Sequence, residues 1–592
     1  MISFIKVAKR RELALLAAVV IVATVVYAGC GDDSSSTTTS GPTTSSAAGP
    51  STTASTAPST TATTVPVEQP LLRIGAIAGG GLFDSLNPYN AYTAAALAAF
   101  MQMYPAIAQF STDLQPQPDL ALSWETSPDG LTWTFKLRDD GVWTDGKPIT
   151  ASDAAFTINT AVKFTAGVAA SVSPFVVGIK DATATDATTL VVTLTSPTPA
   201  LLANLLNLAI LPEHVWGPLA VDDGAQLKTL TNDPSVETVV VSGPFTVEKN
   251  DAKGTTIFKR VDTFYGEKPL IPGYGLQLFT SPDAAAQALK AGDVDVIFPI
   301  PSSLAESLKA DPKLEVQGTS KMPLMFGLNN SPNYKIHPEL TDVRLREAID
   351  IAIDRDQIVS DVYQGYAVPG GSLIYPEYTP KHMSAPLAPV TRDVARANQI
   401  LDEAGYAKGS DGIRVANGQP MEYTVVLWSA RSGDHQRLFG VLKQNLAEIG
   451  ISLVSEMTDD AWGAFIGYTP GEFHSTKDAW LLSFVENPDP DSGLVMFTST
   501  MAEYGISPTG TANPEYDELY KLTKNPDPTA RIATVDAAAA WIQDNHAEIA
   551  LVYWDVLTAW NKQWQNIPDI GCLFTTISYI SKDAFVRVAV QE

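Results

Sequence analysis

A strand, a turn and a helix follow one another in the first third of the chain, and this succession restricts the fold more than any other feature. From residue 131 to 138 large apolar residues alternate with polar ones, a period of two that predicts a half-buried strand. Asp-Gly pairs at 129–130 and 145–146 mark turns on either side. Thr150 and Asp153 then precede apolar residues at helical spacing, which predicts a capped helix. Because short strands alternate with helices along the rest of the chain as well, we expect mixed α/β units with largely covered sheets.

The amino-acid sequence of this region resembles a family signature. Residues 118–160 read PDLALSWETSPDGLTWTFKLRDDGVWTDGKPITASDAAFTINT, which resembles the signature of the family 5 extracellular solute-binding proteins, the peptide-binding type that serves ATP-driven importers. Further segments resemble family motifs in the family's order: 211–214 (LPEH), 242–245 (SGPF), 288–295 (ALKAGDVD), 342–355 (DVRLREAIDIAIDR), 446–453 (LAEIGISL), 487–491 (NPDPD) and 513–517 (NPEYD). The resemblance therefore covers about residue 70 to 550.

The resemblance implies a two-lobed, periplasmic-binding-protein-like α/β fold of class II (cluster C), with an extra subdomain inserted in the first lobe. The expected parts are lobe I (67–110, 240–325 and 550–592), its inserted subdomain (111–239) and lobe II (326–549). A chain of 592 residues is long enough for several such units. The crossings near residues 326 and 549 would form the hinge, and ligand contacts to both lobes would select the closed form.

The first residues have the layout of an export signal. Four basic residues between Lys6 and Arg11 precede an apolar run from Leu13 to Ala28, too short for a typical membrane span. The run ends in Ala-Gly-Cys-Gly around Cys30, which resembles the lipobox of bacterial lipoproteins, whose cysteine is lipidated and becomes the new N-terminus. Residues 1–29 are thus expected to be a signal peptide, with an uncleaved signal anchor as the alternative. Either way the rest of the chain lies outside the cytoplasm, on the membrane face or in a periplasm-like space.

After Cys30 the composition collapses to Ser, Thr, Ala, Gly and Pro up to residue 66. A segment with so few large apolar residues cannot bury enough surface to offset its ordering entropy, so we expect residues 30–66 to be a disordered tether. Such a tether would hold the folded part at a distance from the membrane.

Charge and composition exclude several functions. The net charge of −26 argues against nucleic-acid binding, which needs clustered Lys and Arg. Only two cysteines occur, Cys30 and Cys572, so a disulfide framework or a cysteine metal cluster is not expected. The six histidines are scattered without ligand spacing, and no GxSxG or HExxH motif is present. We therefore expect no metal site, no cofactor and no enzymatic activity.

The resemblance places one specific chemical group. In peptide-binding members an acidic residue just before the "YPDP"-like loop accepts the ligand's α-ammonium group. Alignment on residues 488–490 puts Glu486 at this place, with Asp489 nearby. The alternative is that Glu486 is a surface carboxylate and Asp489 a turn former.

Aromatic residues form a second group of ligand-binding candidates, because peptide binders use them as walls of roomy side-chain pockets. Trp462 follows a predicted strand, Trp428 ends one, and Trp480 lies on the strand that leads to Glu486. Asn329, after an apolar strand, would donate to the ligand backbone or stabilise the hinge. For each tryptophan the alternative is core packing.

The sequence therefore predicts a monomeric, lipid-anchored binding protein that captures a small ligand, first of all a peptide, and delivers it to the permease subunits of an ATP-driven (ABC) importer. Two alternatives stay open. The ligand could be a non-peptide solute such as a sugar, a metal chelate or another amine. The protein could instead be a surface receptor or chaperone for peptides that is not coupled to transport.

Overall fold

The structure is a computed structural model of the 592-residue chain. It describes residues 69–77, 83, 85–91, 93–111, 115–165, 168–169, 171–235, 237–251, 254–372, 374, 376, 379–428, 432–458, 477–483, 488–503, 507–568 and 582–590.

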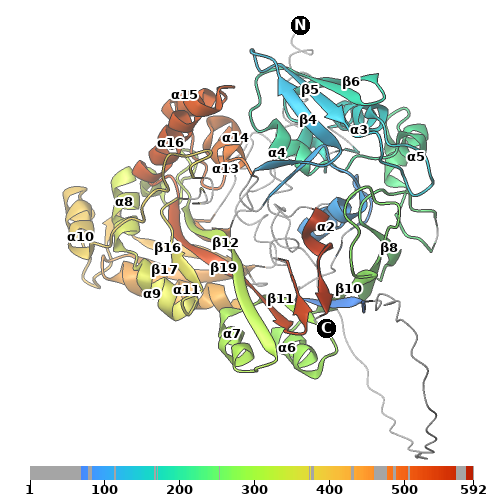
Figure 1. Ribbon diagram of the computed structural model, residues 1–592. Helices are drawn as coiled ribbons and strands as arrows, with labels where there is room; N and C mark the ends of the chain where they lie inside the picture. The colour runs from blue at the N-terminus through green and yellow to red at the C-terminus, as the bar shows by residue number, and fades with distance from the viewer. Residues whose placement is uncertain are drawn as a thin grey trace, which may run out of the picture.

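One 11-stranded sheet runs through both halves of the molecule (Figure 1). Its order is β17-β16-β18-β12-β19-β11-β1-β10-β9-β8, and β13 pairs with β19 off this path. The strands are β1 (Leu72–Ile77), β8 (Phe245–Lys249), β9 (Thr255–Arg260), β10 (Gly273–Phe279), β11 (Val296–Ile300), β12 (Leu314–Leu328), β13 (Ala367–Pro369), β16 (Glu422–Trp428), β17 (Ser452–Thr458), β18 (Ala479–Ser483) and β19 (Ile549–Asn561).

The long strands β12 and β19 join the two halves. They pair antiparallel from Leu314↔Asn561 to Phe326↔Ile549. On one side β11 pairs with the C-terminal part of β19, and on the other β18 pairs with the C-terminal part of β12. We call the half that contains β11, β1 and β10 the first lobe and the half that contains β16–β18 the second lobe. The predicted crossings near residues 326 and 549 fall at one end of this ladder, where Phe326 pairs with Ile549.

A separate four-stranded sheet with its own helices forms the inserted subdomain. Its order is β4-β5-β7-β6. The strands are β4 (Ala121–Thr126), β5 (Thr132–Leu137), β6 (Ile179–Asp186) and β7 (Thr189–Leu194). In β5, Phe135 and Leu137 are buried and Lys136 between them is exposed, which confirms the predicted strand.

Helix α3 (Ala151–Lys163) begins where the sequence predicts and covers this sheet. Asp153 accepts a hydrogen bond from the backbone N–H of Thr150 at 2.8 Å, the carboxylate half of a capping box. Farther along, the Asn159 amide donates to the carbonyl of Ala182 at 2.7 Å and accepts from its N–H at 2.9 Å. The helix is thereby fixed to β6, the edge strand of the sheet, and the free backbone groups of that edge residue are occupied.

The remaining helices cover the large sheet or build the subdomain. They are α2 (Ala94–Met103), α4 (Leu201–Leu206), α5 (Glu213–Trp216), α6 (Pro282–Ala291), α7 (Ser302–Lys309), α8 (Val343–Ala352), α9 (Arg355–Gln357), α10 (Val394–Glu403), α11 (Ser432–Ala447), α13 (Asp491–Leu494), α14 (Ser499–Glu503), α15 (Pro514–Leu522) and α16 (Pro528–Asp544). Short 3-10 and π turns are η1 (Ser173–Val176), η2 (Gly217–Leu219), η3 (Ala225–Lys228), η4 (Pro338–Thr341), η5 (Ile358–Val362), η8 (Val495–Phe497) and η9 (Lys582–Phe585). Minor strands are β2 (Ala108–Phe110), β3 (Pro116–Pro118), β14 (Val415–Ala416), β15 (Gln419–Pro420), β20 (Trp564–Gln565) and β21 (Ala589–Val590).

Each lobe packs helices on its part of the sheet. In the first lobe α6 and α7 bury Leu289 and Leu308 with residues of β11 and β19. In the second lobe α16 packs Ala538 and Trp541 against Trp480 of β18 and neighbouring residues. A helix of membrane-spanning length and apolarity does not occur among the residues from 69 onward that the structure describes.

Candidate functional site

The parallel strands of the second lobe end at one edge of the large sheet. β16 pairs parallel with both β17 and β18, so their last residues, Trp428, Thr458 and Ser483, lie along the same edge. β18 and β19 are both antiparallel to β12, so this edge points along β19 toward the first lobe. In open α/β sheets ligands bind beyond the carboxyl ends of parallel strands.

In the first lobe the carboxyl ends of the parallel strands point the opposite way, toward the second lobe. β1 is parallel to β10 and β11. β11 is antiparallel to β19 and therefore runs the same way as β12, toward the second lobe. The carboxyl ends of β1, β10 and β11 thus point toward those of β16, β17 and β18, with the β12–β19 ladder between them. A ligand placed there would be reached from both lobes.

Trp428 lies at this edge. It is the last residue of β16 and its side chain is half-buried. Its backbone N–H donates to Nδ1 of His435, on α11, at 3.3 Å. At the same edge Trp554 of β19 donates from Nε1 to the hydroxyl of Ser483 at 3.4 Å. The structure therefore brings Trp428, Ser483 and Trp554 to the side of the sheet that faces the first lobe.

Trp480 and Asn329 are placed differently. Trp480 is 1% exposed and its indole covers Gly327, where an added Cβ would lie 2.2 Å from Nε1. Asn329 is fully buried, and its amide donates to the carbonyl of Lys477 at 3.0 Å. Because Lys477 precedes β18, Asn329 lies at the edge opposite to Ser483. Trp480 is thus packed in the core, and the amide of Asn329 ties the end of β12 to the residue before β18.

Asp489 belongs to a buried ion pair. Its two carboxylate oxygens accept from the two terminal nitrogens of Arg531 on α16, both at 2.6 Å. Both side chains are about 5% exposed. Burial alone would raise the pKa of Asp489, but the guanidinium group holds it well below its usual range. The carboxylate is therefore ionised and occupied by an internal partner, which favours a role in shaping the turn.

His382 faces the same carboxylate, with Nδ1 3.9 Å from Oδ2 of Asp489. Burial lowers the pKa of His382 to about 4, against the opposing effect of Asp489. The imidazole is consequently neutral at physiological pH. Asp489 thus has two neighbours, the positively charged guanidinium group of Arg531 and the neutral imidazole of His382.

Three predicted residues, Glu486, Trp462 and Cys30, lie outside the described residues. The strands before two of them are described. Glu486 comes three residues after Ser483, the end of β18, and Trp462 four residues after Thr458, the end of β17. The chain therefore leaves the sheet toward both residues from the edge that faces the first lobe.

Sequence reasoning missed Arg531, Lys524 and His382. Arg531 and Lys524 bind Asp489 and Asp491, the two carboxylates of the Asn-Pro-Asp-Pro-Asp motif. A charge pair that is separated by some 40 residues leaves no local pattern, and α16 shows only its N-cap, Asp527, followed by Pro528. The sequence alone gives no signal that selects these partners.

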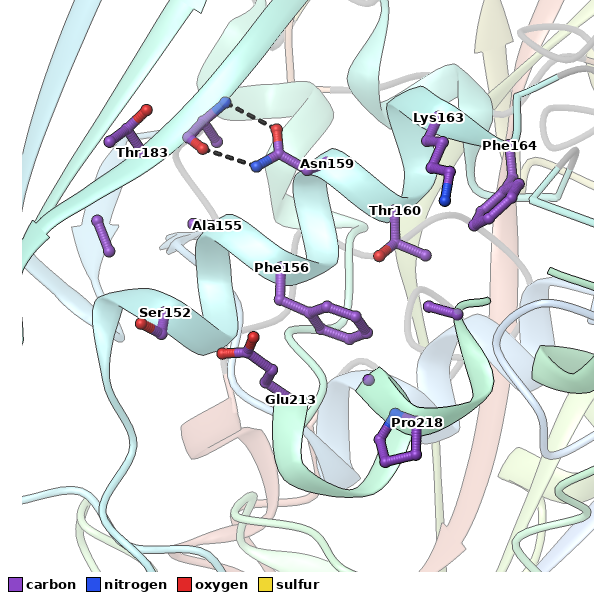
Figure 2. A pocket seen from close by; sticks show the side chains of 14 residues that line it. Ser152, Ala155, Phe156, Asn159, Thr160, Lys163, Phe164, Thr183, Glu213 and Pro218 are labelled. Atoms are coloured by element: carbon purple, nitrogen blue, oxygen red, sulfur yellow. Dashed lines mark hydrogen bonds between the residues drawn. The ribbon is translucent and has the colours of Figure 1, made fainter. Parts of the chain in front are cut away.

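The inserted subdomain carries a groove (Figure 2). Its volume is about 780 Å³, and its walls come from α3, β6, α5 and η2. Phe156 and Phe164 form the apolar part, and Lys163 and Glu213 supply opposite charges. The Lys163 ammonium lies 4.5 Å from the Phe164 ring centroid. All lining residues belong to the inserted subdomain, so this groove is separate from the strand ends of the two lobes.

In the described part of the chain, His, Cys, Asp and Glu side chains nowhere gather three or more together as a set of metal ligands. The histidines that are described have other partners. His337, for instance, is 2.9 Å from Glu339, and His546 is 2.7 Å from Asp350.

Comparison with known proteins identifies the family. The description "Bacterial extracellular solute-binding proteins, family 5 Middle" matches residues 115–504. A Brucella ovis protein named as an ABC transporter peptide-binding protein is 28% identical over 379 residues, which are 63% of this chain and 66% of the relative. The nickel-binding periplasmic protein of Escherichia coli is 25% identical over 383 residues, 63% of this chain and 69% of the relative. The chain thus spans just under two thirds of the Brucella relative.

Among solved structures, the oligopeptide-binding protein AppA from Bacillus subtilis, in complex with a nonapeptide, is similar with a TM-score of 0.70. The alignment covers 89% of this chain and 100% of that chain at 19% sequence identity. At this identity the likeness shows the fold alone. It confirms the predicted two-lobed α/β fold class.

Proposed function

Because the chain belongs to the bacterial extracellular solute-binding proteins of family 5, we propose that it captures a peptide between its two lobes and delivers it to an ATP-driven importer. One observation carries the proposal: the parallel strands of both lobes end toward each other across the β12–β19 ladder. Two lobes that share a ligand can close on it, because contacts to both stabilise the closed form. The family consists of binding proteins rather than enzymes, as the sequence led us to expect.

Glu486 is the residue that we propose as the anchor for the ligand's α-ammonium group. It follows β18 at the edge that faces the first lobe, and a carboxylate there gains strength as closure expels water. Trp428 and Trp462, which end or follow the neighbouring strands, would form walls of the side-chain pockets. Asp489 then has a supporting role, since Arg531 already occupies its carboxylate.

We also propose that Cys30 carries the lipid anchor, with residues 30–66 as the tether between membrane and binding domain. This arrangement would keep the protein near permease subunits. The boundaries of the two lobes and of the inserted subdomain, as drawn from the sequence, belong to the same proposal.

The experiment that tests the proposal is mass spectrometry of whatever small molecule co-purifies with the protein, isolated without unfolding. A set of short peptides with free amino termini is the expected result. Sugars or chelates in place of peptides would overturn the peptide assignment while keeping the binding function. A protein that neither carries a ligand nor gains thermal stability from peptides, sugars and chelates would contradict solute binding itself.

A non-peptide ligand is the second possibility, and the similarity to the nickel-binding protein of Escherichia coli favours a metal chelate among such ligands. A chelate brings its own donor atoms, so the protein would not need a full set of metal-binding side chains. Addition of nickel with histidine should then raise the melting temperature, whereas nickel alone should not.

A further inference from the structure

Among the described residues, two contacts join the second lobe to the inserted subdomain and to the strand that leads into it, and we call them the subdomain contacts. The first involves Gly130, in the turn between β4 and β5. Gly130 is buried although the preceding turn residues Pro128 and Asp129 are exposed. A Cβ built on it would lie 3.1 Å from the Cβ of Pro526, between α15 and α16, and 3.2 Å from that of Pro197. The turn therefore rests on the proline loop of the second lobe, and its φ of +70° suits glycine.

The second contact joins Lys381 to β2, whose partner strand β3 belongs to the inserted subdomain. Lys381 belongs to the segment between β13 and α10 and carries its ammonium 5.4 Å from the ring centroid of Phe110. Phe110 ends β2 and is 4% exposed. This distance is within the range of a cation–π interaction.

Both contacts are connected, through side-chain interactions, to the turn at residues 488–491. Arg531, which holds Asp489, also donates from Nε to the carbonyl of Thr523 at 2.7 Å, three residues before Pro526. Lys524 binds Asp491. On the other side His382, the neighbour of Lys381, faces Asp489 at 3.9 Å. The same turn is thus tied to the proline loop and to the Lys381 segment.

We propose that the Asp489–Arg531 ion pair positions the surface of the second lobe on which the inserted subdomain rests. The pair is buried and bidentate, so it fixes both distance and orientation. A shift of the 488–491 turn moves Arg531, and with it Thr523 and the proline loop that covers Gly130. The subdomain contacts therefore respond to the position of this turn.

The functional consequence of this inference, a link between ligand binding and the subdomain contacts, rests on the proposed function. Glu486, the proposed anchor, is two residues before Pro488 in the sequence, so a ligand held by Glu486 would act on the turn that begins at Pro488. Ligand capture and contact with the subdomain then become coupled, and Arg531 is a positioning residue rather than a ligand-binding one.

The contact between Gly130 and Pro526 can be followed by the rate at which a disulfide forms between cysteines at these two positions. Gly130→Cys and Pro526→Cys are introduced into the full-length chain, with Cys30 and Cys572 changed to serine, and oxidation is followed on non-reducing gels without added ligand. The two Cβ positions lie 3.1 Å apart, a few tenths of an ångström below the usual disulfide range, so the bond can form with small shifts. A Cys at residue 130 is strained at a φ of +70°, but this strain is the same in every variant, so the rate relative to the parent is compared. Addition of Arg531→Met should slow its formation about tenfold, a typical size for coupling between sites.

Arg355→Met is the matched control. Arg355 also forms a buried pair in the second lobe, with Asp350, and both side chains are about 5% exposed. This variant removes a comparable interaction away from the 488–491 turn, so the disulfide should form at the parent rate. Arg531→Lys, which keeps the charge but not the bidentate geometry, should give an intermediate rate.

Three results would overturn the inference: no disulfide in the parent, an unchanged rate with Arg531→Met, or an equal loss with Arg355→Met. If Arg531→Met does not fold, Lys524→Met decides the question, because its side chain is 30% exposed and its loss removes the link to Asp491 together with a cation–π contact to Tyr520. A smaller but measurable slowing is then expected, and an unchanged rate would refute the coupling.

A final arm separates this inference from the proposed function. A defined pool of tri- to pentapeptides with free amino termini is added to the parent and to Arg531→Met. Bound peptide should speed the disulfide in the parent and do so less in the variant. If no peptide raises the melting temperature, the peptide function fails, yet the ligand-free comparison still decides whether Arg531 controls the subdomain contacts.

Discussion

Glu548 should make the protein less stable as the pH rises, and Glu548→Gln should abolish that loss. The residue connects α16 to β19 and is 6% exposed. Both of its carboxylate oxygens are buried, and neither has a hydrogen-bond partner among the described residues. Burial raises the pKa of Glu548 from 4.5 to about 8, so the folded protein holds this group protonated at neutral pH.

The magnitude follows from linkage. Below pH 4.5 the group is protonated in both states and costs nothing. As the pH rises the unfolded chain releases the proton first, so each pH unit between 4.5 and about 8 lowers the free energy of unfolding by roughly 1.4 kcal/mol. At pH 7.5 the accumulated loss is about 4 kcal/mol, three units times that slope. Above pH 8 the difference stays constant.

Urea unfolding from pH 4 to 8.5 at constant ionic strength, followed by tryptophan fluorescence, measures the effect. Other groups titrate in this range, so the informative quantity is the free energy of unfolding of Glu548→Gln minus that of the parent at each pH. It should grow with pH and level off near pH 8. Glu125→Gln, at an exposed position of β4, is the control and should give a flat difference. A flat difference for Glu548→Gln as well would refute the reasoning, because the carboxyl group would then be solvated or paired.

Three further predictions concern separate parts of the chain. Glu486→Gln should weaken binding of peptides with free amino termini about tenfold or more and leave N-acetylated peptides nearly unaffected in calorimetry; equal losses would remove Glu486 as the anchor. Cys30→Ala should release the protein from the membrane fraction on immunoblots, and retention there would disprove the lipid anchor. Lys582→Met should lower the free energy of unfolding by about 3–5 kcal/mol in urea, because it leaves the buried carboxylate of Asp119 uncompensated, while exposed Lys521→Met should change it by less than about 1 kcal/mol.

The sequence predicts local structure well where the residues that decide it are neighbours. The alternation from 131 to 138 forms β5, and Thr150 with Asp153 starts α3 as expected. The order of the large sheet could not be predicted in this way. β1 pairs with strands about 200 residues later, and no local pattern encodes that choice.

The same limit applies to the candidate site. Trp428 could be placed at the sheet edge, because a strand end is a local property. The role of Asp489 depends on Arg531, and that of Trp480 on the missing side chain of Gly327, its partner on the neighbouring strand β12. Both are decided by packing between distant segments, which the sequence does not display.

The β12–β19 ladder also determines when, during synthesis, the large sheet can finish folding. Its second strand, Ile549–Asn561, lies near the end of the chain and pairs with β11 of the first lobe and β12 at the same time. During synthesis the N-terminus is made first. β11 and β12 can therefore pair with β19 only after the last tenth of the sequence has been made. Neither lobe can finish folding alone, so a chain that is truncated before Ile549 should lose both lobes rather than one, and the long-range pairing should make folding slow.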